Sequence, residues 1–233
     1  MTNLQLAGAI VMDPQAAFAD LQKRPTFWFP LLLIVLLGAL GLYWYYSIVD
    51  AAWLTDLMVN SNPKVREMPE AQKAKVAAYM TKSSLMWSSL LFALIGIPVV
   101  KLLEALYYLL AAKVSRLQLT FKQGLTIACW SGLPVLIASL AMFGFLLLRK
   151  GNQINPQELQ LLSLNELFFH IPIGQRWNSL LSALTILHPW MWWLTALGVR
   201  VFSGRSMAFS AVFVGIPLAI FYGGWAVISA VTG

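Results

Sequence analysis

Charged residues are scarce in this sequence, and their scarcity sets the class of the protein. Only 11% of the residues are charged, whereas 59% are hydrophobic. A soluble domain carries about 25% charge. The mean hydropathy is +0.72. A chain this apolar is expected to be an integral membrane protein, with lipid as the solvent that decides its fold.

The residues that enzymes and metal sites need are also few. There is one cysteine, Cys129, which excludes an intrachain disulfide, and there are two histidines. Glu104 is the only acid inside an apolar run. No His/Cys/Asp spacing suits a metal, and neither a GxSxG turn nor a P-loop is present. We therefore expect no enzyme, intramembrane enzymes included, and no metal or cofactor.

Long apolar runs are what the sequence has in abundance. A membrane-spanning helix needs about 20 apolar residues, and backbone groups in lipid must bond within the segment. The first run is too long for a signal peptide, so we expect it to be retained. We predict an all-α membrane domain, 27–233, that is a bundle of five transmembrane helices. The predicted spans are 27–49, 84–112, 124–148, 179–199 and 207–231.

Basic residues indicate the orientation of this bundle. Segments 1–26, 113–123 and 200–206 hold seven lysines and arginines against two acids, whereas loops 50–83 and 149–178 hold eight against six. The positive-inside rule then places the N-terminus in the cytoplasm and the C-terminus outside. The net charge of +7 suits anionic headgroups, and no motif suggests nucleic acid.

The polar N-terminal segment, 1–26, is predicted to contain an amphipathic helix. Asp13 is a good N-cap and Pro14 suits the first helical position. Phe18 and Leu21 then share one face. Such a helix either lies on the membrane or packs on the bundle, and the sequence leaves both open.

Two further helices are predicted outside the spans. In the second outside loop, Asn155, Pro156 and Glu158 form a capping signature ahead of a run of leucines and phenylalanines. This pattern predicts an interfacial helix over 155–169, with packing on the bundle as the alternative. Residues 69–82 are expected to form a helix that leads directly into the second span.

Each predicted span contains one proline. Proline removes a backbone donor and kinks a helix, and kinked helices with nearby glycines can surround a transport cavity, although plain bundles have them too. The predicted kink positions are Pro30, Pro98, Pro134, Pro189 and Pro217.

Lys101 and Glu104 are the candidate polar site. They share a helical face with Tyr108, and a charge at the bilayer centre costs about 2.5–3.5 kcal/mol. Helical side chains lean toward the N-terminus, which opposes escape to the nearer surface, so the pair should face the protein interior. It is either a functional site or an ion pair that locks two helices together. His188, before Pro189, either bonds a freed carbonyl or contacts a proton or substrate.

Three stretches together resemble the Yip family (Ypt/Rab-interacting proteins). They are an amphipathic entry, "DPQAAFADLQKRPTFWFPLLL", a proline-containing span, "FKQGLTIACWSGLPVLIASL", and a basic turn between spans, "LGVRVFSGRSMAFSAVFVGIPLAI". The resemblance runs from about Asp13 to the C-terminus. It implies a five-span member of the bacterial inner membrane. Binding of Rab-type GTPases is not implied, because an Asp-Leu-x-Gly-Pro stretch is missing and "SRLQLT" replaces a glycine pair.

The function expected from these observations is non-enzymatic. The protein would organise or bind membrane components, with membrane lipids, other membrane proteins or a second copy of itself as partners. The alternative is a small transporter or channel, with Lys101, Glu104 and His188 lining an inner polar cavity.

Overall fold

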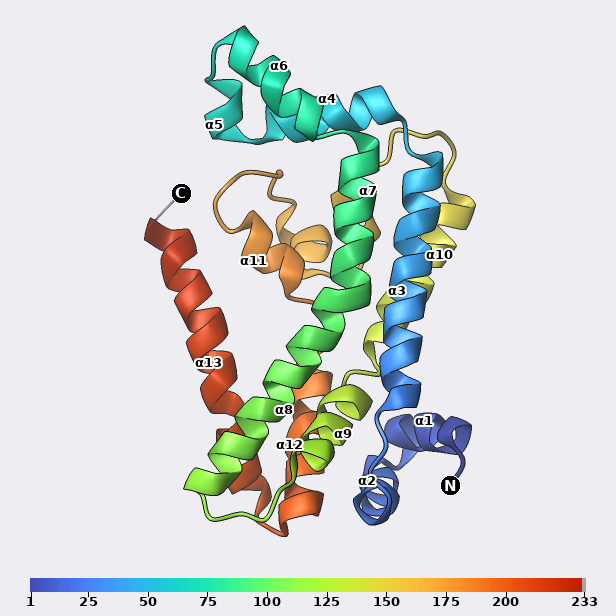
Figure 1. The fold of residues 1–233 in the computed structure, drawn as a ribbon, viewed down its shortest axis with the longest axis vertical. Helices are drawn as coiled ribbons and strands as arrows, with labels where there is room; N and C mark the ends of the chain where they lie inside the picture. The colour runs from blue at the N-terminus through green and yellow to red at the C-terminus, as the bar shows by residue number, and fades with distance from the viewer. Residues whose placement is uncertain (232–233) are drawn as a thin grey trace. The chain divides into compact units, whose positions relative to one another are not determined.

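The computed structural model describes residues 1–231, and helices account for most of them. In that range the only extended pairing is an isolated antiparallel bridge between Ser163 and Thr185. The longer helices can be followed by colour in Figure 1. The elements are α1 Asn3–Met12, α2 Pro14–Lys23, α3 Trp28–Ile48, α4 Ala51–Ser61, α5 Pro63–Arg66, α6 Glu70–Tyr79, α7 Lys82–Leu91, the π-helical turn η1 Phe92–Gly96, α8 Ile97–Val114, α9 Phe121–Ser131, α10 Val135–Leu148, the 3₁₀ turn η2 Pro156–Leu159, the π-helical turn η3 Asn165–Phe169, α11 Asn178–Ala183, α12 His188–Ser203 and α13 Met207–Val231.

Four helical segments within the described residues are long and apolar enough to cross a bilayer. They make this a multi-pass, all-helical membrane protein. Their ranges agree with four of the five predicted spans, and residues 232–233 of the predicted membrane domain lie outside the described residues. The four segments are Trp28–Ile48, Lys82–Val114, Phe121–Leu148 and Met207–Val231.

The predicted span 179–199 is not one continuous helix. It is divided into α11 and the 16-residue α12, which is shorter than the roughly 20 residues of a full span. Between these two helices, the backbone forms hydrogen bonds with the segment before η3. Leu164 N donates to Leu184 O at 2.7 Å, and Ile186 N donates to Leu162 O at 3.0 Å. Pro189, in the first turn of α12, cannot donate at all. Five continuous spans are therefore not reproduced.

The chain divides into two compact units, each assembled from separated segments. Several helices, among them α3, α10 and α13, contribute residues to both. Unit 1 consists of Met1–Leu36, Leu94–Leu136 and Leu187–Phe221, and unit 2 of Leu37–Ala93, Ile137–Ile186 and Tyr222–Gly233.

Helix α9 forms the centre of unit 1. Eight consecutive residues, 124–131, are buried, and α8, α12, α1 and α2 all pack against this helix. Gly124 permits the close approach of α8, since a Cβ there would lie 3.2 Å from the Ala105 carbonyl oxygen. Gly198 on α12 likewise leaves room for the Phe18 ring, whose nearest atom would be 3.1 Å from an added Cβ. Small residues thus set the helix spacing, as in membrane bundles generally.

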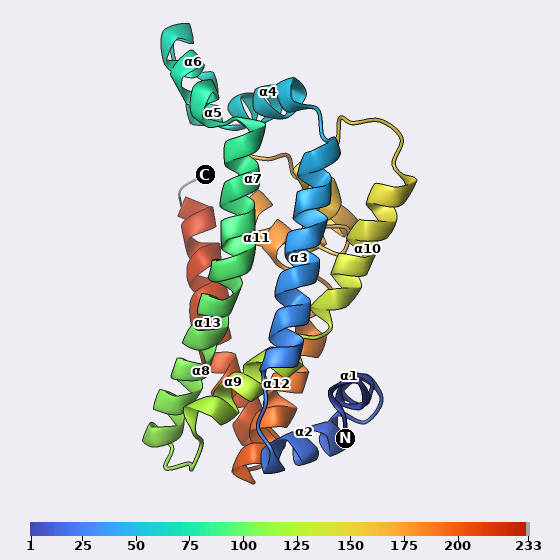
Figure 2. The ribbon, with the colours of Figure 1, turned by 45° about the vertical axis from the view of Figure 1, so that its right-hand side comes forward.

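The N-terminal segment folds into two helices that run across the direction of α3 (Figures 1 and 2). The Asp13 carboxylate accepts a hydrogen bond from Ala16 N at 3.1 Å and caps α2. Phe18 and Leu21 of α2 are fully buried in an apolar cluster within unit 1. The sequence left open whether this helix lies on the membrane or packs on the bundle. In the structure its apolar face packs on the bundle.

Helix α1 was not predicted from the sequence. Thr2 and Gln5 form a capping box at its N-terminus, and its inward residues, Leu6 and Ile10, are buried. Its other face is apolar too and lies open: Leu4 is 77% exposed and Met12 is 88% exposed.

In unit 2, the segment between α3 and α7, predicted to be the first outside loop, contains three helices, α4 to α6. Helix α6 ends at Tyr79, so it does not continue directly into α7, as 69–82 was expected to do. Thr81 caps α7 by accepting from Ser84 N at 3.2 Å, and Thr55 Oγ1 holds the turn by donating to Met80 O at 3.1 Å. The Thr81 cap and the hydrogen bond from Thr55 therefore end the helix at a point where the sequence pattern predicts that it continues.

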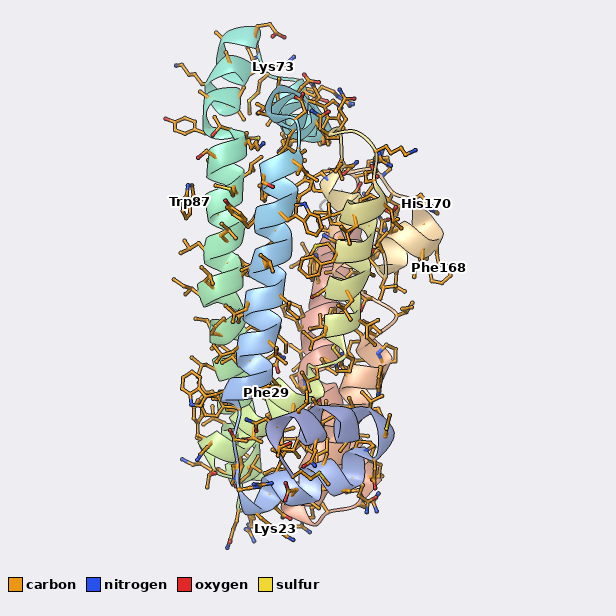
Figure 3. The ribbon with its side chains drawn as sticks, turned by 90° about the vertical axis from the view of Figure 1, so that its right-hand side faces the viewer. Lys23, Phe29, Lys73, Trp87, Phe168 and His170 are labelled. Atoms are coloured by element: carbon orange, nitrogen blue, oxygen red, sulfur yellow. The ribbon has the colours of Figure 1, made fainter. Side chains whose placement is uncertain are left out.

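The segment after α10, predicted to be the second outside loop, has the predicted cap but not the predicted helix. Asn155 and Glu158 form a capping box on the four-residue turn η2, and the chain then leaves the helical path. Asn165 Oδ1 accepts from Ile171 N at 2.9 Å, and the Ile171 carbonyl oxygen accepts from three amides, those of Gln157, Asn165 and Asn178. These side chains compete with helical bonding, so the continuous helix over 155–169 was wrong. Phe168 and His170 project from this loop in Figure 3.

Candidate functional site

Lys101 and Glu104 form an ion pair within α8. Lys101 Nζ lies 3.0 Å from each carboxylate oxygen of Glu104. The two side chains are 18% and 35% exposed, respectively. Because both partners belong to one helix, the bond does not itself lock two helices together, which corrects that part of the prediction. The two charges compensate each other at a spacing of three residues.

The pair lies on the face of α8 that packs against other helices. Ile97 and Ala105, one turn to either side of Lys101, pack in a cluster with Leu31 of α3 and with Leu125 and Cys129 of α9. Leu102, Leu103 and Leu106, on the other side of α8, are exposed. In a membrane protein such residues face lipid. Lys101 and Glu104 therefore stand among packed apolar neighbours.

A second polar contact lies deeper in unit 1. Tyr108 is buried on α8, and its hydroxyl interacts with the Thr195 side chain of α12. Thr195 Oγ1 donates to Ser131 Oγ of α9 at 2.9 Å. Together these three side chains join α8, α9 and α12. The sequence singled out only Tyr108, because serine and threonine are common in apolar helices and their meeting depends on the packing.

His188 lies at the N-terminus of α12, not near the middle of a span. The half-buried ring packs edge-on against Trp192, with centroids 5.5 Å apart. Both residues belong to unit 1, as does the Lys101–Glu104 pair.

The five prolines occupy different positions. Pro30 and Pro189 lie in the first turns of α3 and α12, where a missing N–H costs little, and Pro98 is the second residue of α8, which follows η1. Pro134 lies in the turn between α9 and α10, and α13 continues through Pro217. A π-helical turn before Pro98 is the local irregularity that precedes the ion pair.

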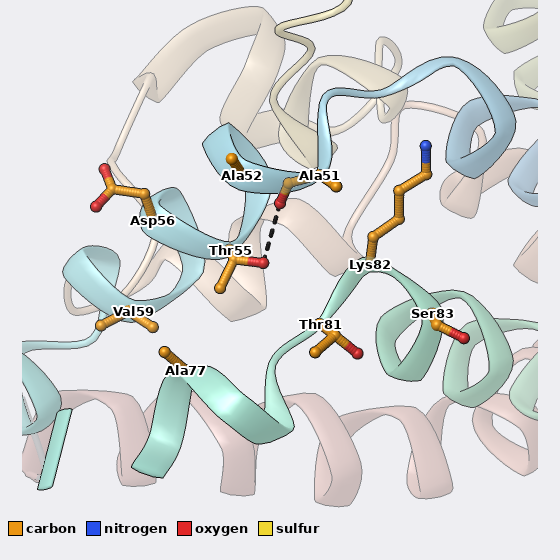
Figure 4. A pocket seen from close by; sticks show the side chains of 9 residues that line it. All are labelled: Ala51, Ala52, Thr55, Asp56, Val59, Ala77, Thr81, Lys82 and Ser83. Atoms are coloured by element: carbon orange, nitrogen blue, oxygen red, sulfur yellow. Dashed lines mark hydrogen bonds between the residues drawn. The ribbon is translucent and has the colours of Figure 1, made fainter. Parts of the chain in front are cut away.

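Four hollows stand out in the described residues, and none of the four is lined by Lys101, Glu104, Tyr108 or His188. The largest, of about 630 Å³, lies in unit 2 beside α4. Figure 4 shows Lys82 and Asp56 extending away from each other there, and Lys82 Nζ donates to Val49 O at 2.7 Å. Small side chains line the remainder, so this hollow offers no converging charges.

A hollow lined by two arginines lies in unit 1, between α2 and the turn that joins α12 to α13. Its volume is about 610 Å³, and its lining includes Arg200 and Arg205. In the sequence analysis these arginines served only to predict the orientation of the chain in the membrane. For a metal, no group of three or more His, Cys, Asp or Glu side chains is found among residues 1–231.

Comparison with known families identifies the chain. The profile of the Yip1 domain matches residues 8–228. The chain belongs to the Yip family. Comparison with curated proteins gave no match, and neither did comparison with solved structures. The region matched in this Yip family member includes the ion pair and both arginines, so each candidate site lies within the family domain.

Proposed function

We propose that this Yip family member is a non-enzymatic membrane protein that organises or binds lipids or other membrane proteins, and that it does not move a solute through its interior. The observation that carries the proposal is the closed Lys101–Glu104 pair, with each carboxylate oxygen 3.0 Å from the ammonium. A transport site must exchange partners, and opening this partly buried pair leaves uncompensated charge, at a cost of about 2 kcal/mol.

The N-terminal helices support binding at the membrane surface. Helix α1 runs across the direction of α3, beside the start of that span at Trp28 (Figure 3, where Phe29 is labelled). Its exposed face carries Leu4, Val11 and Met12. Lys23 is exposed at the end of α2. An apolar helix face with nearby cations suits the boundary between headgroups and acyl chains, so we assign α1 to that boundary.

The proposed topology has the N-terminus in the cytoplasm and the C-terminus outside, in a bacterial inner membrane. The chain would make five crossings, the fourth by α11 and α12 together. The support is the pair of basic residues before α13, Arg200 and Arg205, which favours a cytoplasmic start for this helix. Residues 149–206 would then have to return across the bilayer after α10. A phosphatase reporter, active only outside the cytoplasm, should be active when fused after Gly233, and activity of a cytoplasmic reporter there would overturn this topology.

Reconstitution tests the function itself. Proteoliposomes of the parent protein and of a Lys101→Met/Glu104→Met variant should show proton and potassium flux equal to that of protein-free liposomes. Both proteins should also retain phospholipid or a protein partner through extensive washing in neutral detergent. Flux in the parent that the variant abolishes would favour transport, and a parent that retains neither lipid nor protein would contradict the binding function.

A further inference from the structure

The hollow between α2 and the α12–α13 turn is built from two helix ends and a helix side. Gln15 and Ala19 of α2 form one wall, and the other wall is formed by Arg200, Val201, Gly204, Arg205, Ser206 and Met207. The walls are held together, because Gln22 of α2 donates to Val201 O at 3.1 Å. The hollow is therefore a fixed feature of unit 1.

Both arginines of this hollow lack a carboxylate partner within the described part of the chain. The acid within α2, Asp20, is already bound by Arg24 at 2.7 Å. Gln15, Ala19 and Ser206 contribute no charge. The hollow is thus lined by two exposed arginines, and the Arg205 guanidinium lies 5.8 Å from the centre of the Phe209 ring. Guanidinium groups suit a planar or tetrahedral oxyanion.

The turn beside the hollow joins two helix ends, the C-terminus of α12 and the N-terminus of α13, whose partial charges are opposite in sign. Ser206 caps the helix by accepting from Phe209 N at 3.2 Å, and Gly204, with φ of 68°, makes the tight turn that precedes it. A helix N-terminus carries a partial positive charge. At 1.5 Å per residue, the 25 residues of α13 span about 37 Å, more than the ~30 Å hydrocarbon core, so its first turn reaches headgroup level.

We propose that Arg200 and Arg205 bind a phosphate ester in this hollow, and specifically the phosphodiester of an anionic phospholipid headgroup. The position at the end of a span favours the lipid over a soluble phosphate compound. This site rests on the proposed function, because it names the lipid class that the protein binds.

The test uses the full chain in neutral detergent micelles. Acyl-labelled fluorescent phosphatidylglycerol is titrated against the parent and against an Arg200→Gln/Arg205→Gln variant, with labelled phosphatidylcholine as the reference lipid. We expect the variant to lose phosphatidylglycerol affinity at least tenfold, while phosphatidylcholine binding, which needs no net anion, changes little. The matched control is Lys113→Gln/Lys122→Gln, which removes the same charge from exposed residues elsewhere and should keep the parent's affinity.

Competition with inorganic phosphate distinguishes the two sources. Phosphatidylglycerol that resists millimolar phosphate supports the lipid site, whereas displacement at such concentrations overturns the lipid and assigns the arginines to a soluble phosphate. Equal affinity of parent and arginine variant would overturn the site altogether. That result leaves the proposed function standing if the parent still retains lipid and shows no flux, so the two failures are distinguishable.

Discussion

Unit 1 and unit 2 both bury apolar side chains of their non-spanning segments, Ile154 of unit 2 included, but unit 2 adds a cluster of side-chain amides. In unit 1, α1 and α2 are fixed by apolar side chains: Leu6, Ile10 and Phe18 are at most 1% exposed. In unit 2, the segment between α10 and α12 is fixed by side-chain amides that converge on the Ile171 carbonyl. Apolar burial is non-directional and tolerates repacking, whereas hydrogen bonds from side-chain amides require a narrow range of distances and angles. We therefore expect core substitutions to affect unit 1 globally and polar substitutions to affect unit 2 locally.

The largest effect is expected from Phe18→Ala in unit 1. Its ring is 0% exposed and fills the space beside Gly198. Truncation should cost about 3–5 kcal/mol of unfolding free energy, through lost burial and the cavity left behind. Denaturant unfolding in detergent micelles measures it. The matched control is Phe168→Ala in unit 2, where the ring is 66% exposed and the change should stay within about 0.5 kcal/mol. Equal costs would remove the contrast between the units.

The next effect concerns the ion pair. Lys101→Met alone or Glu104→Met alone leaves one charge among apolar neighbours and should cost about 2 kcal/mol, less than the 3–5 of a fully buried pair. The double Met variant should lie within about 1 kcal/mol of the parent, because it removes both charges. A double-mutant cycle of unfolding free energies gives the coupling between them. Additive single costs would show that the two residues act independently.

The N-terminal helix and the ion pair show what could be predicted from the sequence. Helix α2 was predictable because its cap, Asp13, and its apolar face are local signals. The contact between Lys101 and Glu104 follows in the same way from their spacing of three residues. Helix α1 has the same length as α2 and a local signal of its own, the Thr2–Gln5 capping box, which the prediction overlooked.

Other features depend on contacts that no local pattern contains. The leucine-rich run after Asn155 was read as a helix, but Ser163 and Asn165 bond backbone groups instead. The fourth span is interrupted by bonds from residues 162–164. The contact between Ser131 and Thr195 and the hollow beside Arg200 exist only once α9, α12 and α2 have packed.

A smaller and local effect is expected from Asn165→Ala in unit 2. The substitution removes two hydrogen bonds to Ile171 and leaves its N–H unpaired, at about 1–2 kcal/mol. Amide hydrogen exchange should accelerate over residues 160–175 and stay unchanged in α9. As a control, Asn60→Ala removes an exposed side-chain hydrogen bond to Asp56 and should leave amide exchange unchanged in both regions. Faster exchange in both units would mean that the amide contacts stabilise the whole chain.

The smallest effect is a pH dependence in unit 1. The Arg24 guanidinium and the Met1 amine, 2.7 and 2.9 Å away, hold the pKa of Asp20 below its ordinary value of 3.8. A lowered folded-state pKa stabilises the protein above the unfolded-state value, and the contribution disappears as the pH falls through the lowered one. The melting temperature of the parent should exceed that of Asp20→Asn at pH 6, with a difference that shrinks below about pH 4. Salt should reduce this difference, because the carboxylate is solvent-accessible. A difference that persists unchanged to pH 2 would assign the effect of Asp20 to packing and would leave its ion pairs with no measurable part in the stability of unit 1.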